Sequence, residues 1–206
     1  MAIETTIKPF LDELASGAPA PGGGSAGAAV GAMGAALVSM VCNLTVGKEK
    51  FAAVEAELQE VLAQAEARRA ELTRLITDDT AAFNQVMAAF RLPKESEADR
   101  ATRREAIQAA TQQATRVPLA TARACAQVIE LSQVVAKLGN PNAVSDAGAA
   151  AACARAGLKA AALNVLINLP SIKDRAFVAA QQAELEQILA KQTLADEVYE
   201  LVKKKL

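Results

Sequence analysis

One stretch of the sequence constrains the fold more than any other, because no charged side chain occurs between Pro19 and Gly47. The stretch is rich in Ala and Gly and contains the run Gly22-Gly23-Gly24 near its start. A helix that is apolar on all sides is buried in a core or crosses a membrane. We expect burial and no membrane span, because Ala and Gly gain little from lipid and no aromatic or basic belt flanks both ends. The small side chains predict that other helices pack closely against this one.

Residues 51–90 have the spacing of an amphipathic helix that packs in a bundle. The side chains of one face recur at alternating intervals of four and three residues, which is the period of a helical seam. Two members of this series, Arg69 and Asp79, are charged where the pattern calls for apolar residues. The whole series is Leu58, Leu62, Ala65, Arg69, Leu72, Ile76, Asp79, Phe83, Val86 and Phe90.

Further helices are expected after residue 93. A long amphipathic helix over residues 97–138 is interrupted or kinked by Pro118, and an Ala-rich helix runs from 146 to about 168. A final amphipathic helix begins at a capping box formed by Ser171 and Asp174 and continues to the C-terminus. The prediction is therefore an all-α single domain over residues 1–206. It is a helical bundle of five to six helices, in which two long amphipathic helices pack with Ala/Gly-rich buried helices.

Charge, aromatic content and cysteine usage exclude several classes of protein. The net charge is −1 with a pI near 5.7, and aromatic residues make up 3% of the chain, with no Trp. Nucleic-acid binding relies on basic surface and aromatic stacking, so no nucleic-acid partner is expected. Cys42, Cys125 and Cys153 are widely spaced in apolar surroundings, which fits reduced thiols in a cytoplasmic protein. The N-terminal residues lack the pattern of a signal peptide.

The chain contains no histidine, so it lacks the commonest general base and metal ligand. Catalysis by a Ser-His-Asp or Cys-His arrangement is excluded within this chain, and the scattered cysteines do not make a zinc site. No metal site is therefore expected. Acid–base chemistry would have to use Asp, Glu, Lys, the single Tyr199 or a thiol.

The run Pro21-Gly22-Gly23-Gly24-Ser25 precedes the first Ala/Gly-rich helix, and we expect Ser25 to be the N-cap of that helix. Backbone N–H groups at a helix N-terminus can bind an anion. The run is not a P-loop, because no Gly-Lys-Ser/Thr follows it. The alternative is that the glycines only provide a flexible start to a close-packed helix.

A second polar cluster, GNPNAVSD, spans residues 139–146. It brings together Asn140, Asn142, Ser145 and Asp146, with Ser145 expected to be the N-cap of the following helix. These side chains can bind a ligand, or they can serve only as ordinary turn and cap residues.

Two charged residues complete the set of candidates. Asp79 lies one turn from Ile76 and Phe83, where an unpaired carboxylate is costly. It is either part of a structural ion pair, for example with Arg69, or a functional carboxylate whose pKa is tuned by burial. Lys48 is either an ordinary exposed lysine or part of the same functional site.

Four stretches, in order, carry a resemblance to a known family: APAPGGGSAGA, MVCNLTVGKEKF, DTAAFNQVMAAFRLP and GNPNAVSDAG. They resemble the methenyltetrahydrofolate cyclohydrolases related to the cyclodeaminase domain of formiminotransferase-cyclodeaminase, over essentially the whole chain. The resemblance implies an all-helical homodimer without a formiminotransferase domain. The implied reaction is the reversible hydrolysis of the folate substrate 5,10-methenyltetrahydrofolate to 10-formyltetrahydrofolate, without metal or nucleotide cofactor.

The resemblance also raises the matching residues as site candidates. Asp79 or Asp146 would be the carboxylate that stabilises the cationic methenyl carbon, orients water and accepts its proton. Lys48 would serve the glutamate tail or a proton transfer, while Asn140 and Asn142 would fix substrate or water. The glycines would admit the ligand at one end of a folate cleft whose far end carries polar groups. The remaining predicted substrate-binding residues are Pro21, Gly22, Gly23, Gly24, Ser25, Asn43, Thr45 and Ser145.

Two alternatives remain open from the sequence. The first is a formiminotetrahydrofolate cyclodeaminase, which releases ammonia while forming the same methenyl product. The second is a helical scaffold protein without catalytic activity, in which Arg69 and Asp79 form only a pair that fixes helix register.

Overall fold

The computed structural model describes residues 3–206, with side-chain environments from Ile7 onward, and the described residues contain helices but no strand. The predicted all-α bundle is confirmed. The α-helices are α1 (Ile3–Leu14), α2 (Gly23–Asn43), α3 (Glu55–Phe90), α4 (Glu97–Leu138), α5 (Val144–Asn168), α6 (Arg175–Leu189) and α7 (Gln192–Lys203). Short 3-10 segments are η1 (Glu49–Val54), η2 (Pro141–Ala143) and η3 (Leu169–Ser171).

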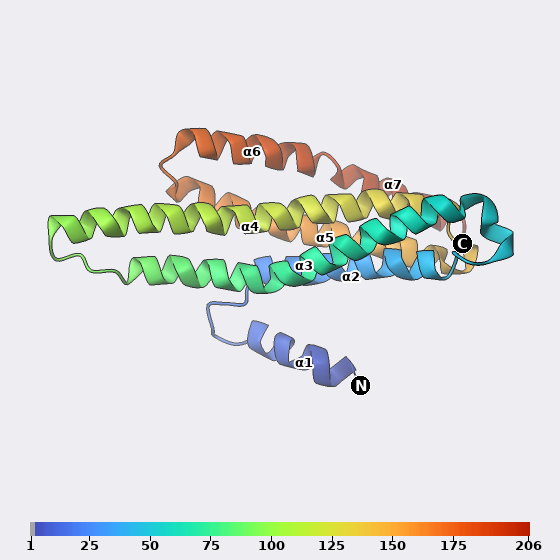
Figure 1. Ribbon diagram of the computed structural model, residues 1–206, viewed down its shortest axis with the longest axis horizontal. Coiled ribbons are helices and arrows are strands. Elements are labelled where there is room, and N and C mark those ends of the chain that lie inside the picture. The colour runs from blue at the N-terminus through green and yellow to red at the C-terminus, as the bar shows by residue number, and fades with distance from the viewer. Residues whose placement is uncertain (1–2) are drawn as a thin grey trace.

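The four longest helices run along the long axis of the molecule (Figure 1). α3 and α4 form an extended antiparallel pair, and α2 and α5 pack alongside them. α6 and α7 lie on one side of the bundle, whereas α1 lies on the opposite side, near α2 and α3. The closest packing joins α2 to α5 and α4 to α5, so the Ala-rich helices form the centre of the bundle.

Several helix boundaries differ from the sequence prediction. α4 continues through Pro118 from residue 97 to 138 without ending, because Pro118 and its neighbours Val117 and Leu119 are all buried by tertiary packing. The expected single C-terminal helix is divided into α6 and α7 near residue 190. Its start is capped by Asp174, whose side chain accepts a hydrogen bond from Phe177 N, while Ser171 lies in η3.

Glycine allows the backbones of α2 and α5 to approach each other closely. A Cβ atom added at Gly157 would lie 2.6 Å from the carbonyl oxygen of Gly27 and 3.1 Å from the amide nitrogen of Gly31. A Cβ atom at Gly34 would lie 2.9 Å from the carbonyl oxygen of Ala150. These backbone atoms cannot rotate away as a flexible side chain can. The Ala and Gly content of the uncharged stretch therefore sets the distance between the two central helices.

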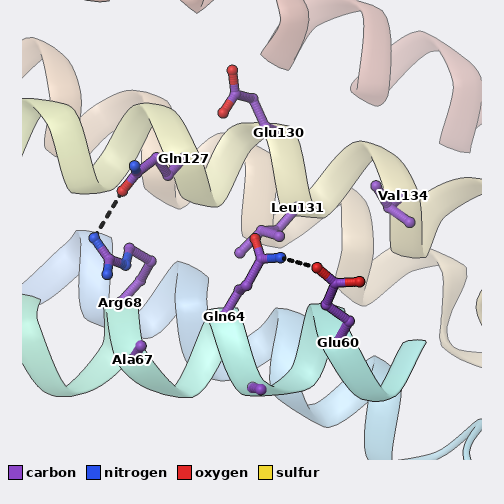
Figure 2. Close-up of a pocket in the computed structure, with 9 residues that line it drawn as sticks. Glu60, Gln64, Ala67, Arg68, Gln127, Glu130, Leu131 and Val134 are labelled. Atoms are coloured by element: carbon purple, nitrogen blue, oxygen red, sulfur yellow. Dashed lines mark hydrogen bonds between the residues drawn. The ribbon is translucent and has the colours of Figure 1, made fainter. Parts of the chain in front are cut away.

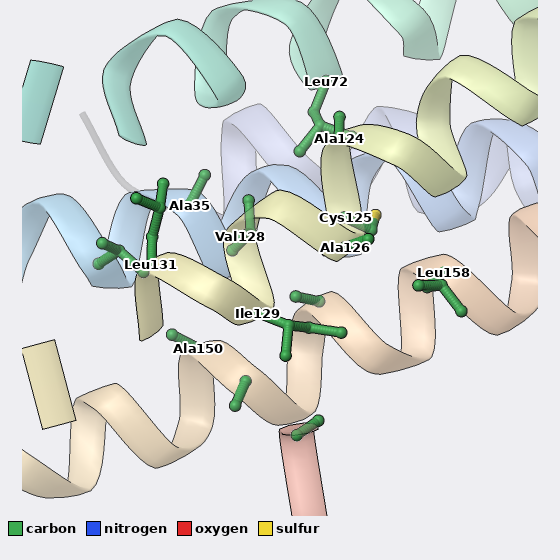
Figure 3. Packing of buried hydrophobic residues seen from close by; sticks show 14 of the residues in the cluster. Ala35, Leu72, Ala124, Cys125, Ala126, Val128, Ile129, Leu131, Ala150 and Leu158 are labelled. Atoms are coloured by element: carbon green, nitrogen blue, oxygen red, sulfur yellow. The ribbon is translucent and has the colours of Figure 1, made fainter. Parts of the chain in front are cut away.

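The core around this contact is made of small and medium apolar side chains (Figure 3). Ile129 of α4 points toward α5, where Ala150 and Leu158 lie, and Leu72 of α3 lies next to Ala124 of α4. All five side chains are buried. α4 thus packs against both α5 and α3, and α2 also packs directly against α3.

Two helical segments are long and apolar enough to cross a membrane by length and composition, namely Gly23–Asn43 and Pro141–Ser171. In the bundle, 56% and 44% of their most apolar windows are buried against other parts of the protein. Packing within the core accounts for that part of their apolar composition.

We expect Gly157→Ala to destabilise the fold by about 1–3 kcal/mol, because the added methyl group overpacks a contact between two backbones. At an unobstructed helix position the same change stabilises by about 1 kcal/mol, so the sign of the effect tests the close approach. Urea denaturation gives the free energy of unfolding. The exposed neighbour Ala156 provides a control, since Ala156→Gly changes helix propensity alone. A higher denaturation midpoint for Gly157→Ala would contradict the packing described above.

Candidate active site

The carboxylate of Asp79 on α3 lies against the first turn of α2. Ser25 Oγ donates a hydrogen bond of 2.8 Å to Asp79 Oδ2. Ser25 Oγ lies 3.3 Å from Thr80 Oγ1 as well. α2 begins at Gly23 with Gly22 as its N-cap, so the prediction that Ser25 is the N-cap is wrong. Its hydroxyl is directed to the carboxylate of another helix instead.

Glycine is required beside Asp79 for steric reasons. A Cβ atom added at Gly24 would lie 2.2 Å from Asp79 Oδ1 and 2.6 Å from its Cγ. The carboxylate therefore occupies the space that a side chain at position 24 would fill. This contact brings Asp79 to the N-terminus of α2, where the orphan amides and the helix dipole favour negative charge.

Asp79 lines a cavity of about 360 Å³, a volume in the range of small-molecule sites. Gly22, Gly23 and Gly24 form one wall, and the apolar side chains Phe83 and Val86 extend the α3 wall beyond the carboxylate. Another part of the lining comes from α4 and the C-terminal end of α5, with residues Ala114, Asn164, Ile167 and Asn168. The cavity thus combines one acidic group with a mostly apolar lining.

Burial raises the pKa of Asp79 above its ordinary value, and this effect outweighs the hydrogen bond from the side chain of Ser25, which lowers that pKa. The expected ion pair with Arg69 is not formed. Arg69 instead pairs with Glu66 on the same helix, at 2.5 Å between Nη2 and Oε2. A carboxyl group with a raised pKa in a cavity has the properties of a general acid–base catalyst.

A separate network fastens the C-terminal end of α2 to the connection between α4 and α5. Thr45 Oγ1 donates to Val41 O at 2.6 Å and accepts from Asn140 N at 2.9 Å. Asn140 Nδ2 donates to Leu44 O at 3.0 Å, and Asn140 Oδ1 accepts from Asn142 N at 3.1 Å. Thr45 has no exposed surface, so the predicted contact between Thr45 and substrate is not supported. Thr45 instead anchors the polar cluster of residues 139–146 to the C-terminal end of α2 through its hydrogen bond with Asn140.

This network lies at the far end of α2 from Asp79. α2 contains 21 residues and is therefore about 30 Å long. Lys48 is exposed beyond its C-terminus and donates to Leu44 O at 2.6 Å, and Asn43 is exposed at its last position. A single chain does not bring these two residues into the cavity that holds Asp79.

The predicted residues of the second motif stay near this far end as well. Asp146 lies in the first turn of α5, whereas Asn164, which lines the Asp79 cavity, lies in its last turns. Ser145 is exposed and is not the expected N-cap, because α5 begins at Val144 after Ala143. The expectation of one cleft that joins all the candidate residues is therefore not met within one chain, which separates them into two clusters.

A larger groove of about 520 Å³ lies between α3 and α4 and contains none of the predicted site residues (Figure 2). Four of its polar side chains are engaged with each other, and the fifth, Glu130, pairs with Lys191. Arg68 Nη1 donates to Gln127 Oε1 at 2.9 Å, and Gln64 Nε2 donates to Glu60 Oε1 at 3.2 Å. The smaller Asp79 cavity is therefore the better candidate.

Comparison with known proteins identifies the family of this chain. The sequence profile of the formiminotransferase-cyclodeaminase family matches residues 6–187. The chain belongs to the formiminotransferase-cyclodeaminase family. The crystal structure of formiminotetrahydrofolate cyclodeaminase from Thermotoga maritima superposes with a TM-score of 0.83 at 34% identity, covering 97% of this chain and 94% of that one.

Two curated relatives illustrate the two activities named within the family. The methenyltetrahydrofolate cyclohydrolase of Methylorubrum extorquens is 52% identical over 207 residues, which cover the whole of both chains. The formimidoyltransferase-cyclodeaminase of Sus scrofa is 37% identical over 183 residues, 89% of this chain but 34% of that protein. The chain thus spans about a third of the length of that relative and the full length of the cyclohydrolase.

We expect Gly24→Ala to displace Asp79 and to lower the catalytic efficiency of the enzyme by about 100-fold or more, in line with misplacement of a catalytic group by about 1 Å. Gly17→Ala is the matched control, because no atom lies within 4 Å of a Cβ added there. Steady-state kinetics on the two variants, with circular dichroism to confirm folding, measures the difference. Equal activity of both variants would show that the position of Asp79 against α2 is unimportant.

Proposed function

We propose that this protein is a methenyltetrahydrofolate cyclohydrolase, which reversibly hydrolyses 5,10-methenyltetrahydrofolate to 10-formyltetrahydrofolate in one-carbon metabolism. The observation that carries the proposal is the half-buried carboxylate of Asp79 in a small, mostly apolar cavity, in a chain that matches a cyclohydrolase of this name over its whole length. Cyclodeamination is the activity named for relatives of 34% and 37% identity. The cyclohydrolase assignment is therefore favoured over the cyclodeaminase.

The chemistry of the substrate fits one carboxylate without a metal ion or cofactor. The methenyl bridge is a cationic amidinium carbon, which is already electrophilic, so water can attack it once a base is in place. Asp79 stabilises the cation and accepts a proton from the attacking water. The carbinolamine that results opens by cleavage of the bond between the bridge carbon and N5, and the protonated Asp79 delivers its proton to N5. The hydroxyl proton of the intermediate goes to solvent as the formyl C=O forms.

The first turn of α2 supports this reaction in two ways. Ser25 holds Asp79 Oδ2, which leaves Oδ1 for the water and the departing nitrogen. The unpaired amides of the glycines at the start of α2 can donate to a substrate oxygen. We place the enzyme in the cytoplasm, on the basis of its free cysteines. Burial raises the pKa of Cys42 to about 11, so this thiol stays protonated near neutral pH.

The test of this function is the decay of the 5,10-methenyltetrahydrofolate chromophore at slightly acidic pH, where spontaneous hydrolysis is slow. We expect rapid decay with the wild-type protein, and a decrease in kcat of about 100-fold to 10,000-fold with Asp79→Asn. Absence of decay, together with ammonia release from 5-formiminotetrahydrofolate, would favour the cyclodeaminase. Full activity of Asp79→Asn would remove Asp79 from the mechanism.

A stability measurement on Asp79→Asn provides an independent check. The raised pKa means that the ionised carboxylate destabilises the fold. This cost is absent below the ordinary pKa and is fully present above the raised one. The variant should therefore gain melting temperature relative to wild type as the pH rises from 4 to 8.

We also propose that the enzyme is a homodimer formed through α2. Met33, Ala36, Met40 and Asn43 form an exposed, uncharged stripe along this helix with spacings of three and four residues, and Met33 and Met40 are 47% and 46% exposed. A two-fold axis across the middle of α2 would pair two copies antiparallel. The Asp79 end of one copy would then lie beside the end of the partner's α2 that carries Lys48. This arrangement would reunite the two clusters and leave Lys48 to serve the glutamate tail of the folate.

We expect Met40→Lys to dissociate the dimer, because the interface would bury an unpaired charge. The activity and the molecular mass in solution should then fall together. Tyr199→Lys on α7 is the matched control, since Tyr199 is 55% exposed and lies outside this stripe. Light scattering coupled to size-exclusion chromatography gives the mass of each variant. A wild-type mass of one chain would refute the dimer, and a dimeric Met40→Lys variant would refute this interface.

A further inference from the structure

The wall of the Asp79 cavity formed by α5 carries two amide side chains that have no part in the mechanism above. Asn164 and Asn168 lie one turn apart near the C-terminal end of α5, and both line the cavity. Asn164 Nδ2 lies 3.3 Å from the point that a Cβ at Gly23 would occupy, so this side chain stands beside the glycine wall of α2. Neither amide is fully exposed.

The hydrogen bonds of Asn168 leave only an acceptor for a ligand. Its Nδ2 group donates to Ala114 O on α4 at 3.0 Å and to Asn164 O at 3.0 Å, which uses both amide protons. The reversed amide would place Asn168 Oδ1 against two carbonyl oxygens, so its orientation is fixed by the backbone. Within the described residues no hydrogen bond is made to Asn168 Oδ1.

Asn164 is oriented in the same way, since its Nδ2 donates to Ala160 O at 2.8 Å. Its Oδ1 atom likewise accepts no hydrogen bond from the part of the chain that the structure describes. Both amides line the cavity with an Oδ1 atom that is available to accept a hydrogen bond, and Asn164 Nδ2 keeps one further proton. A cavity wall of this kind selects a flat ligand with N–H donors on its edge.

Resting on the proposed function, we propose that Asn164 and Asn168 determine specificity by accepting hydrogen bonds from the N–H groups of the pterin ring. The pyrimidinone edge of a reduced pterin carries the donors that match, namely the 2-amino group and the ring N–H groups. The glutamate tail carries carboxylates, which the two amide oxygens and Asp79 repel. Phe83, Val86 and Ile167 supply apolar surface for the faces of the ring. The amides thus orient the pterin with its bridge carbon toward Asp79.

The test compares tetrahydrofolate with its 2-desamino-2-methyl analogue by isothermal titration calorimetry. Wild-type protein should bind the analogue about 10- to 100-fold more weakly, because a buried acceptor loses its partner. In Asn164→Leu the ratio of the dissociation constants of the analogue and of tetrahydrofolate should fall toward one. The same result is expected for Asn168→Leu, if that variant folds without its hydrogen bond to Ala114. The acidic limb of the pH profile of kcat, which depends on the pKa of Asp79, should not shift. Asn84→Leu is the control, since Asn84 is exposed on α3 and does not line the cavity.

The outcomes separate this inference from the proposed function. If the wild-type protein turns over the methenyl substrate and Asn164→Leu has the same ratio of dissociation constants as wild type, the role of the amides is overturned. The cyclohydrolase assignment then stays intact. Equal affinity of the wild-type protein for tetrahydrofolate and for the analogue would also overturn the role of the amides. Failure of wild type to bind tetrahydrofolate or to turn over the methenyl substrate would overturn the proposed function and this inference together. A ratio that falls in Asn164→Leu but not in Asn84→Leu supports the inference.

Discussion

The close approach of α2 and α5 is the contact on which the rest of the structure depends. Gly27 and Gly157 let the two backbones touch, and α4 packs over the pair with small apolar side chains. The same approach sets the width of the candidate site, because the cavity lies where the start of α2 meets the end of α5. Gly23 and Asn164 lie next to each other in its lining. Core packing and the shape of the site are therefore consequences of one interhelix distance.

The carboxylate of Asp79 gives the cavity a negative charge that a cationic ligand would balance. Asp79 has no basic side chain as a partner among the described residues, and burial raises its pKa even though Ser25 bonds it. An ionised carboxylate in such a place is costly by itself. A cationic methenyl group supplies the missing counterion, so binding relieves the cost and lowers the pKa of the carboxyl group toward the ionised, basic form. In the proposed reaction the substrate activates its own base.

The sequence predicted the helices well and singled out Asp79 as a candidate, because both depend on local periodicity. An acidic residue in an apolar seam is visible without any tertiary information, as is a glycine run before a small-residue helix. The Arg69 partner was wrong, since ten residues along a helix are about 15 Å. The amides of Asn164 and Asn168 were missed, because Asn near the end of a helix is ordinary. Only the packing of α5 against the start of α2 shows that they face a cavity.

The separation of the candidate residues into two clusters follows from helix length and could not be read from motif order. A straight helix of 21 residues keeps its two ends about 30 Å apart, whereas folate chemistry needs a reacting group at the pterin and a polar group for the tail. In the proposed dimer, two antiparallel copies of α2 would solve this problem by symmetry, because each copy would offer one end to each of two equivalent sites. The uncharged stripe on α2 and the distance between the motifs then have the same explanation. In the proposed dimer, α2 would pack on its own bundle on one side and on the partner's α2 on the other, which would leave no face of the helix for charged side chains.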